Sequence, residues 1–106
     1  MEPTTTYIQD LPALVSEIPE DSIISRTFHE DERLKMILFG FAPGQELSEH
    51  TASKPAMLHF LQGEADLQLG DQAQTAGAGT WVSMPANLPH SVHARSKVIM
   101  LLVLYQ

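Results

Sequence analysis

The chain has 106 residues, a mass of 11.7 kDa and a formal net charge of −7. Its length predicts one domain, and its hydrophobic content of 43% is that of a globular protein and excludes wholesale disorder. The acidic balance and the six scattered basic residues argue against binding to nucleic acid or to an anionic membrane surface. Cysteine is absent, which excludes disulfides, thiolate zinc sites and a cysteine nucleophile.

From the sequence we expect no signal peptide and no membrane-spanning segment. The start, MEPTTTYIQD, lacks the basic flank and apolar stretch of a signal peptide. The longest apolar run, residues 98–105, is too short to cross a bilayer of ~30 Å as a helix. We therefore expect a cytoplasmic protein with no membrane partner.

Residues 1–21 form a mixed segment that contains Pro3, Pro12 and Pro19. The segment has too many apolar residues for a free tail, and we predict an arm that covers the main body, with one helical turn around residues 11–17. The main body is then a single domain over residues 22–106.

The rest of the chain is dense in strand signals. Residues 55–70 divide at Gly63, where a bulge or break is expected, and Gly70-Asp71 is a hairpin turn signal. Short strands at regular spacing with Gly and Pro turns predict an all-β sandwich or barrel. The expected strand segments are residues 22–30, 33–42, 55–70, 72–77, 80–86 and 91–106.

Three of these segments are apolar on both faces: residues 36–41, 57–61 and 98–105. A lone antiparallel barrel has a polar outer face, so something must cover these strands from outside. The N-terminal arm can cover some of this surface, and we predict a homodimer in which a second copy covers the rest. The alternative is one large two-layer core.

Two stretches of the sequence have the spacing of a motif. In the first, five residues separate Gly44 from His50, Ala52 and Ala56 follow two and six positions after His50, and six residues separate Ala56 from Gly63.

In the second stretch, five residues separate Gly79 from Pro85, and His90 follows. Both stretches resemble the two signatures of the cupin family. Family members have His and Glu at the places of Ala52 and Ala56, and Gly and Asn at the places of Asn87 and Ala94. The resemblance covers roughly residues 22–105, and the ligand set is degenerate.

The resemblance implies a small single-domain, RmlC-like cupin. Its expected fold is the double-stranded β-helix (jelly-roll) barrel, often dimeric, with the N-terminal arm added here. In the family a divalent transition metal (Fe, Mn, Ni or Zn) is held inside the barrel by three His and one Glu. Family members include dioxygenases, isomerases, decarboxylases and sugar-binding domains, so the fold does not select a function.

His50 and His90 are the two residues at family ligand positions and are the candidate metal ligands. The carboxylate place holds Ala56. Glu46 shares strand parity with His50, but four extended residues separate them by roughly 13 Å. Three interpretations stay open: a metal site, a pair of pocket histidines satisfied by hydrogen bonds and water, and polar anchors for an acidic ligand.

The alanines at positions 52 and 56 leave space in the mouth of the barrel. Residues that share strand parity with the motif positions are expected to line a ligand pocket with His50 and His90; they are Leu58, Phe60, Met84 and Val92. The alternative is that large side chains fill this space. His59 and His93 have the opposite parity and are expected to face away.

The function predicted from the sequence is small-molecule binding in the barrel near His50 and His90, by a cupin of unassigned activity. One alternative is a metal-dependent enzyme of the oxygenase or isomerase type that uses the same two histidines. The other is a dimeric sensor or interaction module.

Overall fold

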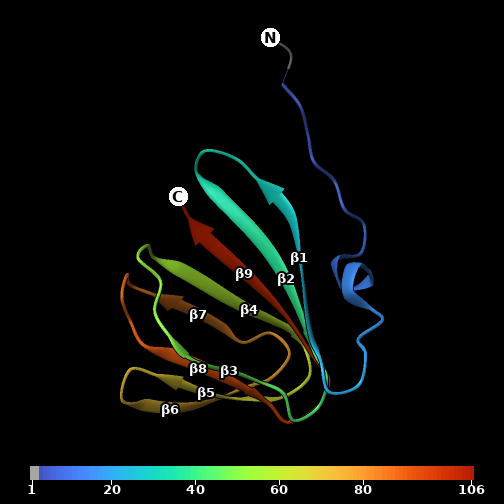
Figure 1. Cartoon of the computed structure of the whole chain (residues 1–106). Coiled ribbons are helices and arrows are strands. Elements are labelled where there is room, and N and C mark those ends of the chain that lie inside the picture. Colours follow the sequence, from blue (N-terminus) through green and yellow to red (C-terminus); the bar gives the residue numbers. More distant parts are fainter. Residues whose placement is uncertain (1–2) are drawn as a thin grey trace.

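The computed structural model describes residues 3–106, in which one short 3-10 helix precedes nine strands (Figure 1). The elements are η1 (Leu11–Val15), β1 (Ile23–Glu30), β2 (Leu34–Phe41), β3 (Glu46–His50), β4 (Ala56–Gln62), β5 (Ala65–Leu69), β6 (Gln72–Ala76), β7 (Trp81–Met84), β8 (His90–Ala94) and β9 (Val98–Tyr105). No helix among these residues is long and apolar enough to cross a membrane.

The strands form two antiparallel sheets. One has five strands in the order β1-β2-β9-β4-β7, and the other has four in the order β3-β8-β5-β6. Non-consecutive strands are neighbours in both sheets, as in a jelly roll. The all-β jelly-roll fold predicted from the sequence is confirmed.

Gly63 ends β4 and starts the turn into β5. Its φ of +89° lies in the left-handed region that glycine adopts readily. A Cβ at this position would also collide with the backbone carbonyl oxygen of Lys97. The chain breaks here because only glycine satisfies both conditions, and the long apolar segment becomes two strands in different sheets.

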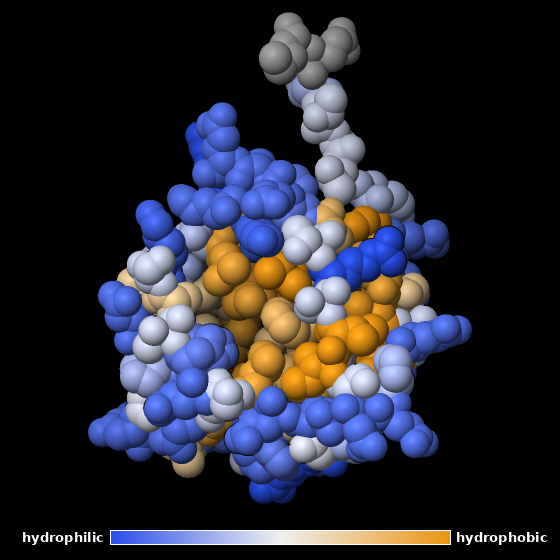
Figure 2. Space-filling view, viewed as in Figure 1, coloured by the Kyte–Doolittle hydropathy of each residue, from blue (hydrophilic) through white to orange (hydrophobic). Residues whose placement is uncertain are grey.

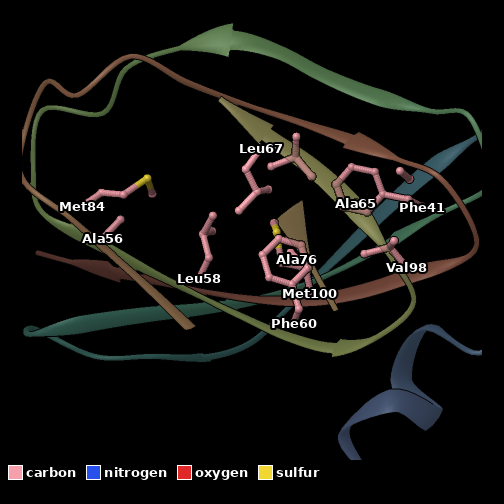
Figure 3. Close-up of a cluster of buried hydrophobic side chains, with 12 residues drawn as sticks. Phe41, Ala56, Leu58, Phe60, Ala65, Leu67, Ala76, Met84, Val98 and Met100 are labelled. Carbon is pink, nitrogen blue, oxygen red and sulfur yellow. The ribbon is translucent and has the colours of Figure 1, made fainter. Parts of the chain in front are cut away.

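The core lies between the two sheets. Along β4, Ala56, Leu58 and Phe60 are buried while the residues between them are more exposed, which is the period-two pattern of a strand with one face inward. In Figure 3, Met84 and Ala56 lie at one end of the buried cluster, and Phe41 and Val98 at the other. The cluster therefore runs the length of the barrel.

The outer face of the five-stranded sheet carries a second apolar cluster. Val15 of η1 packs with Leu38 of β2 and Ile99 of β9, and all three are buried. Gly40 makes room for the arm, because a Cβ there would come within 2.7 Å of the Ile18 side chain. The arm thus lies over one part of β2 and β9, while the extended chain before η1 projects from the body (Figure 1).

The three strands that are apolar on both faces are β2, β9 and β4, which are adjacent in the centre of the sheet. Beyond η1, their outer face stays partly open: Met57 and Leu101 are half-buried, and Trp81 on the neighbouring edge strand is 60% exposed. Figure 2 shows apolar side chains gathered in one patch beside the N-terminal segment.

Candidate functional site

His50 ends β3 and His90 begins β8, and the two residues are direct cross-strand partners. Their ring centroids lie 4.2 Å apart, with an angle of 55° between the ring planes. His90 is 7% exposed, whereas His50 is exposed. The pair therefore extends from the interior of the barrel to its surface.

Both rings are held in the same way. His50 Nδ1 lies 2.8 Å from the carbonyl oxygen of Ser48, and His90 Nδ1 lies 2.9 Å from that of Leu88. A carbonyl oxygen only accepts hydrogen bonds, so each Nδ1 must carry the proton and donate it. In the neutral form each Nε2 then keeps its lone pair and can accept a hydrogen bond or bind a metal.

The two alanines lie close to this pair along the chain but differ in burial. Ala56 is buried at the start of β4, where it pairs with Met84 and Leu104. Ala52 lies in the β3–β4 loop, and its carbonyl oxygen accepts a 2.7 Å hydrogen bond from the backbone N–H of Asn87. Asn87 has a φ of +68°, a conformation that asparagine tolerates, which explains why it can replace the glycine of the motif.

The predicted lining residues pack together in the core. Each of them is at most 2% exposed, and all belong to the same buried cluster as Ala56; they are Leu58, Phe60, Met84 and Val92. Large apolar side chains thus fill the barrel interior, including the end where Met84 pairs with Ala56.

The inner face of β9 becomes more accessible toward the C-terminal end of the strand. On β9, Val98 and Met100 are buried, while Leu102 and Leu104 further along the same face are half-buried. A hollow of 330 Å³ opens beside Leu104 and is lined also by Ala52 and Lys54. Larger hollows, of 350, 550 and 760 Å³, lie elsewhere on the molecule. Neither these hollows nor the one beside Leu104 is lined by His50 or His90.

The expectation that Glu46 shares a face with His50 is wrong. Glu46 pairs with His93, whereas Leu47 pairs with the buried Val92, because the β3–β8 register shifts between Leu47 and His50. The shift breaks the alternation of faces on which the parity count depends. His93 is exposed, and His59 pairs with the exposed Trp81, so both face away from the barrel as predicted.

The site offers too few ligand side chains to hold a metal ion. In the described part of the chain, residues 3–106, no three His, Cys, Asp or Glu side chains group so as to hold a metal ion. Catalytic zinc sites use three protein ligands, and non-haem iron sites use two His and one carboxylate. The two imidazoles without a carboxylate therefore do not fit the family's metal.

Lys35 and Leu104 also lie at this end of the barrel, and sequence reasoning did not identify them. Lys35 pairs with Leu104, which in turn pairs with Ala56. Lys35 belongs to the inward-facing set of β2 with Phe39 and Phe41. The signal available in the sequence was a lysine that shares the strand alternation of the apolar Phe39 and Phe41.

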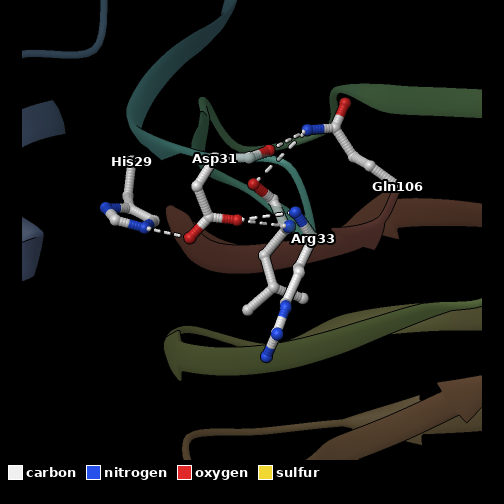
Figure 4. Close-up of polar contacts among 5 residues, drawn as sticks. His29, Asp31, Arg33 and Gln106 are labelled. Atoms are coloured by element: carbon white, nitrogen blue, oxygen red, sulfur yellow. Dashed lines mark hydrogen bonds and ion pairs between the residues drawn. The ribbon is translucent and has the colours of Figure 1, made fainter.

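The turn before β2 holds this strand start in place (Figure 4). Asp31 accepts hydrogen bonds from the amides of Arg33 and Leu34 at 2.8 and 2.9 Å and contacts His29 Nε2 at 3.0 Å. The bond from Leu34, then those from Arg33 and His29, lower the pKa of Asp31 from 3.8 to about 2. Gln106 donates to the Asp31 carbonyl oxygen at 2.7 Å, which ties the C-terminus to the turn.

Comparison with known proteins identifies the family. The cupin domain pattern matches residues 37–105. This chain belongs to the cupin family. No match was found among curated proteins.

Solved structures of other cupin-like proteins are similar over almost the whole chain. A conserved Streptococcus pyogenes protein of unknown function, SPY1581, is 29% identical, with 97% of this chain and 90% of that chain covered and a TM-score of 0.84. A cupin superfamily protein from Desulfitobacterium hafniense is 25% identical, with coverage of 97% and 93% and a TM-score of 0.85. A cupin 2 conserved barrel domain protein from Leptotrichia buccalis is 30% identical over 89% of this cupin and 46% of that chain, with a TM-score of 0.80.

Proposed function

We propose that this cupin binds a small molecule at the open end of its barrel, against His50 and His90. The observation that carries the proposal is the ring pair: two imidazoles 4.2 Å apart, each with Nδ1 bonded to a carbonyl oxygen and Nε2 left for another partner. A mostly apolar recess with a few convergent polar groups is the usual form of a small-molecule site.

The accessibility gradient supports the same end of the barrel. The half-buried Leu102 and Leu104 provide apolar surface on the inner face of β9, toward the end where Leu104 pairs with Ala56. Ala56 removes the carboxylate that family members place here, so a ligand meets a smaller and less charged wall.

A thermal-shift screen against a metabolite library tests the proposal. A ligand at about 100 times its Kd stabilises a protein by about 2.7 kcal/mol, which raises the Tm of a domain of this size by roughly ten degrees. We expect hits with the wild type that are lost in His50→Ala and in His90→Ala. His93→Ala is the matched control, because His93 lies on the outer face, and it should keep every hit. Hits that survive both site variants, or no hits at all, would refute binding at this pair.

A metal-dependent enzyme is the second candidate, favoured by the two free Nε2 atoms. It ranks lower because the described residues offer no carboxylate beside the rings. Elemental analysis of the natively purified protein decides between them: a stoichiometric transition metal that is absent from His50→Ala would favour the enzyme.

A further inference from the structure

Lys35 lies at the same end of the barrel as the histidine pair. It is next to the start of β2, and its direct neighbour on β9 is Leu104, followed by Ala56 on β4. Strands are spaced by about 4.8 Å, so the Cα atoms of Lys35 and Ala56 are roughly 10 Å apart. β2 and β3 are joined by a short connection at the other end of the barrel, so the chain reverses direction between them. His50, the last residue of β3, therefore lies at the same end as the start of β2.

The Lys35 side chain is half-buried on an apolar row, yet it has no ionic partner. Within residues 3–106, the ion pairs are His29–Asp31 and Arg95–Asp66, and no carboxylate oxygen lies within 4.0 Å of Lys35. No buried side-chain nitrogen or oxygen of the described residues lacks a hydrogen-bond partner, so the unpaired Lys35 ammonium reaches solvent, where a bound anion would pair with it.

Several other charged side chains lie near this end, including Asp31, Glu32 and Arg33 of the turn before β2. Glu30 is the cross-strand neighbour of Lys35 on β1 and is exposed, and Glu49 precedes His50. Lys54 lines the hollow beside Leu104. Glu30 competes with a ligand for Lys35, whereas Lys54 adds positive potential at the entrance.

The histidines need a hydrogen-bond donor on the ligand, whereas Lys35 needs an anion. Because each Nδ1 donates to a backbone carbonyl, a neutral ring offers only the Nε2 acceptor. A ligand group that pairs with it must donate a hydrogen bond, as a hydroxyl does.

We infer that the ligand is a small hydroxycarboxylic acid with an apolar body. Its carboxylate pairs with the Lys35 ammonium, its hydroxyl donates to Nε2 of His50 or His90, and its apolar body lies against the half-buried Leu104. The inference rests on the proposed function and specifies the ligand class of the same site.

Three matched probes test the inference by isothermal titration: 4-hydroxyphenylacetate, phenylacetate without the hydroxyl, and 4-hydroxyphenylacetamide without the charge. We expect 4-hydroxyphenylacetate to bind at least tenfold more tightly than either of the others, since each of the others lacks one of the two polar contacts with the site.

The Lys35 variants separate charge from packing. Lys35→Gln should weaken 4-hydroxyphenylacetate about tenfold and leave 4-hydroxyphenylacetamide unchanged, and Glu30→Gln should tighten 4-hydroxyphenylacetate. Lys97→Gln is the matched control, because Lys97 lies at the other end of the barrel beside Gly63. Circular dichroism confirms that each variant is folded.

Equal binding of the three probes, or a Lys35→Gln variant with unchanged affinity for the acid, would overturn the hydroxycarboxylate inference. So would the absence of binding by all three probes at 10 mM in ~0.1 M salt, where exposed charges are already partly screened. A library hit that depends on His50 would still support the proposed function, so the two failures are distinguishable.

Discussion

At the scale of single residues, the two histidines make the same local hydrogen bond. Each ring bonds through Nδ1 to the carbonyl oxygen two residues earlier, Ser48 for His50 and Leu88 for His90. The bond selects the tautomer and orients the ring without any other side chain. The two rings are therefore preorganised, although the family's other ligand places hold alanine.

Asp31 is the second residue whose chemistry is set locally. Its carboxylate accepts two backbone hydrogen bonds within the turn and contacts His29. These bonds favour the charged form, which is why the pKa falls to about 2.

Asp31 should therefore make stability depend on pH at the acidic end. Its folded pKa of about 2 lies below the ordinary value of 3.8, so its contribution is complete well above pH 3.8 and is lost as the pH falls through 3.8 toward 2. We expect wild type to be more stable than Asp31→Asn at pH 7 and the difference to shrink between pH 4 and pH 2. Urea unfolding at each pH measures it. A difference that stays constant over this range would contradict the assignment.

At the scale of elements, η1 acts as a cover for the central strands. Val15 is 2% exposed and packs with Leu38 and Ile99 on the outer face of the sheet. Lys97 Nζ donates to the Ser16 carbonyl oxygen at 3.2 Å, which adds a polar contact at the end of the helix. The packing of the arm therefore contributes to the stability of the folded domain.

Val15→Ala should destabilise the protein by about 2 kcal/mol, since it removes two buried methyl groups and leaves a cavity. Chemical denaturation measures the loss. Tyr7→Ala is the control within the same arm: Tyr7 is 79% exposed, and its replacement should change stability by less than about 0.5 kcal/mol. Equal effects of the two substitutions would show that the arm does not pack as described.

Some element features could be predicted and others could not. The break at Gly63 follows from one residue type in an apolar run, and the structure bears it out. The register shift between Leu47 and His50 has no such local signal, because it depends on how β3 pairs with β8. Parity counted across it placed Glu46 on the wrong face.

At the scale of the whole molecule, the outer face of the five-stranded sheet is larger than the arm that covers it. Trp81 is 60% exposed beside His59, and Leu101 is the neighbour of His59 on the other side. Apolar surface of this kind, rimmed by polar residues, is typical of association sites. A homodimer through this face, predicted from the sequence, stays a prediction.

Sedimentation equilibrium tests the predicted homodimer. We expect a particle of about 23 kDa, twice the chain mass of 11.7 kDa, and a Trp81→Glu variant that dissociates at least tenfold more readily, because a charge must be desolvated in the contact. Gln74→Glu places the same charge at an exposed position on β6, the edge strand of the other sheet, and should leave association unchanged. A wild type that is monomeric at ~100 μM, a concentration at which interfaces with micromolar Kd are saturated, would disprove the dimer.

The sequence by itself predicted the fold class, most of the strands and the motif spacing of the two histidines, because alternation, Gly and Pro turns and motif spacing are local properties of the chain. It did not predict β3 (Glu46–His50) as a strand. Only the tertiary structure decided that His50 and His90 meet at 4.2 Å, that Glu46 faces outward and that Lys35 stands beside Leu104 at the open end. These three facts depend on the register between strands distant in sequence, and register is a property of the assembled sheets.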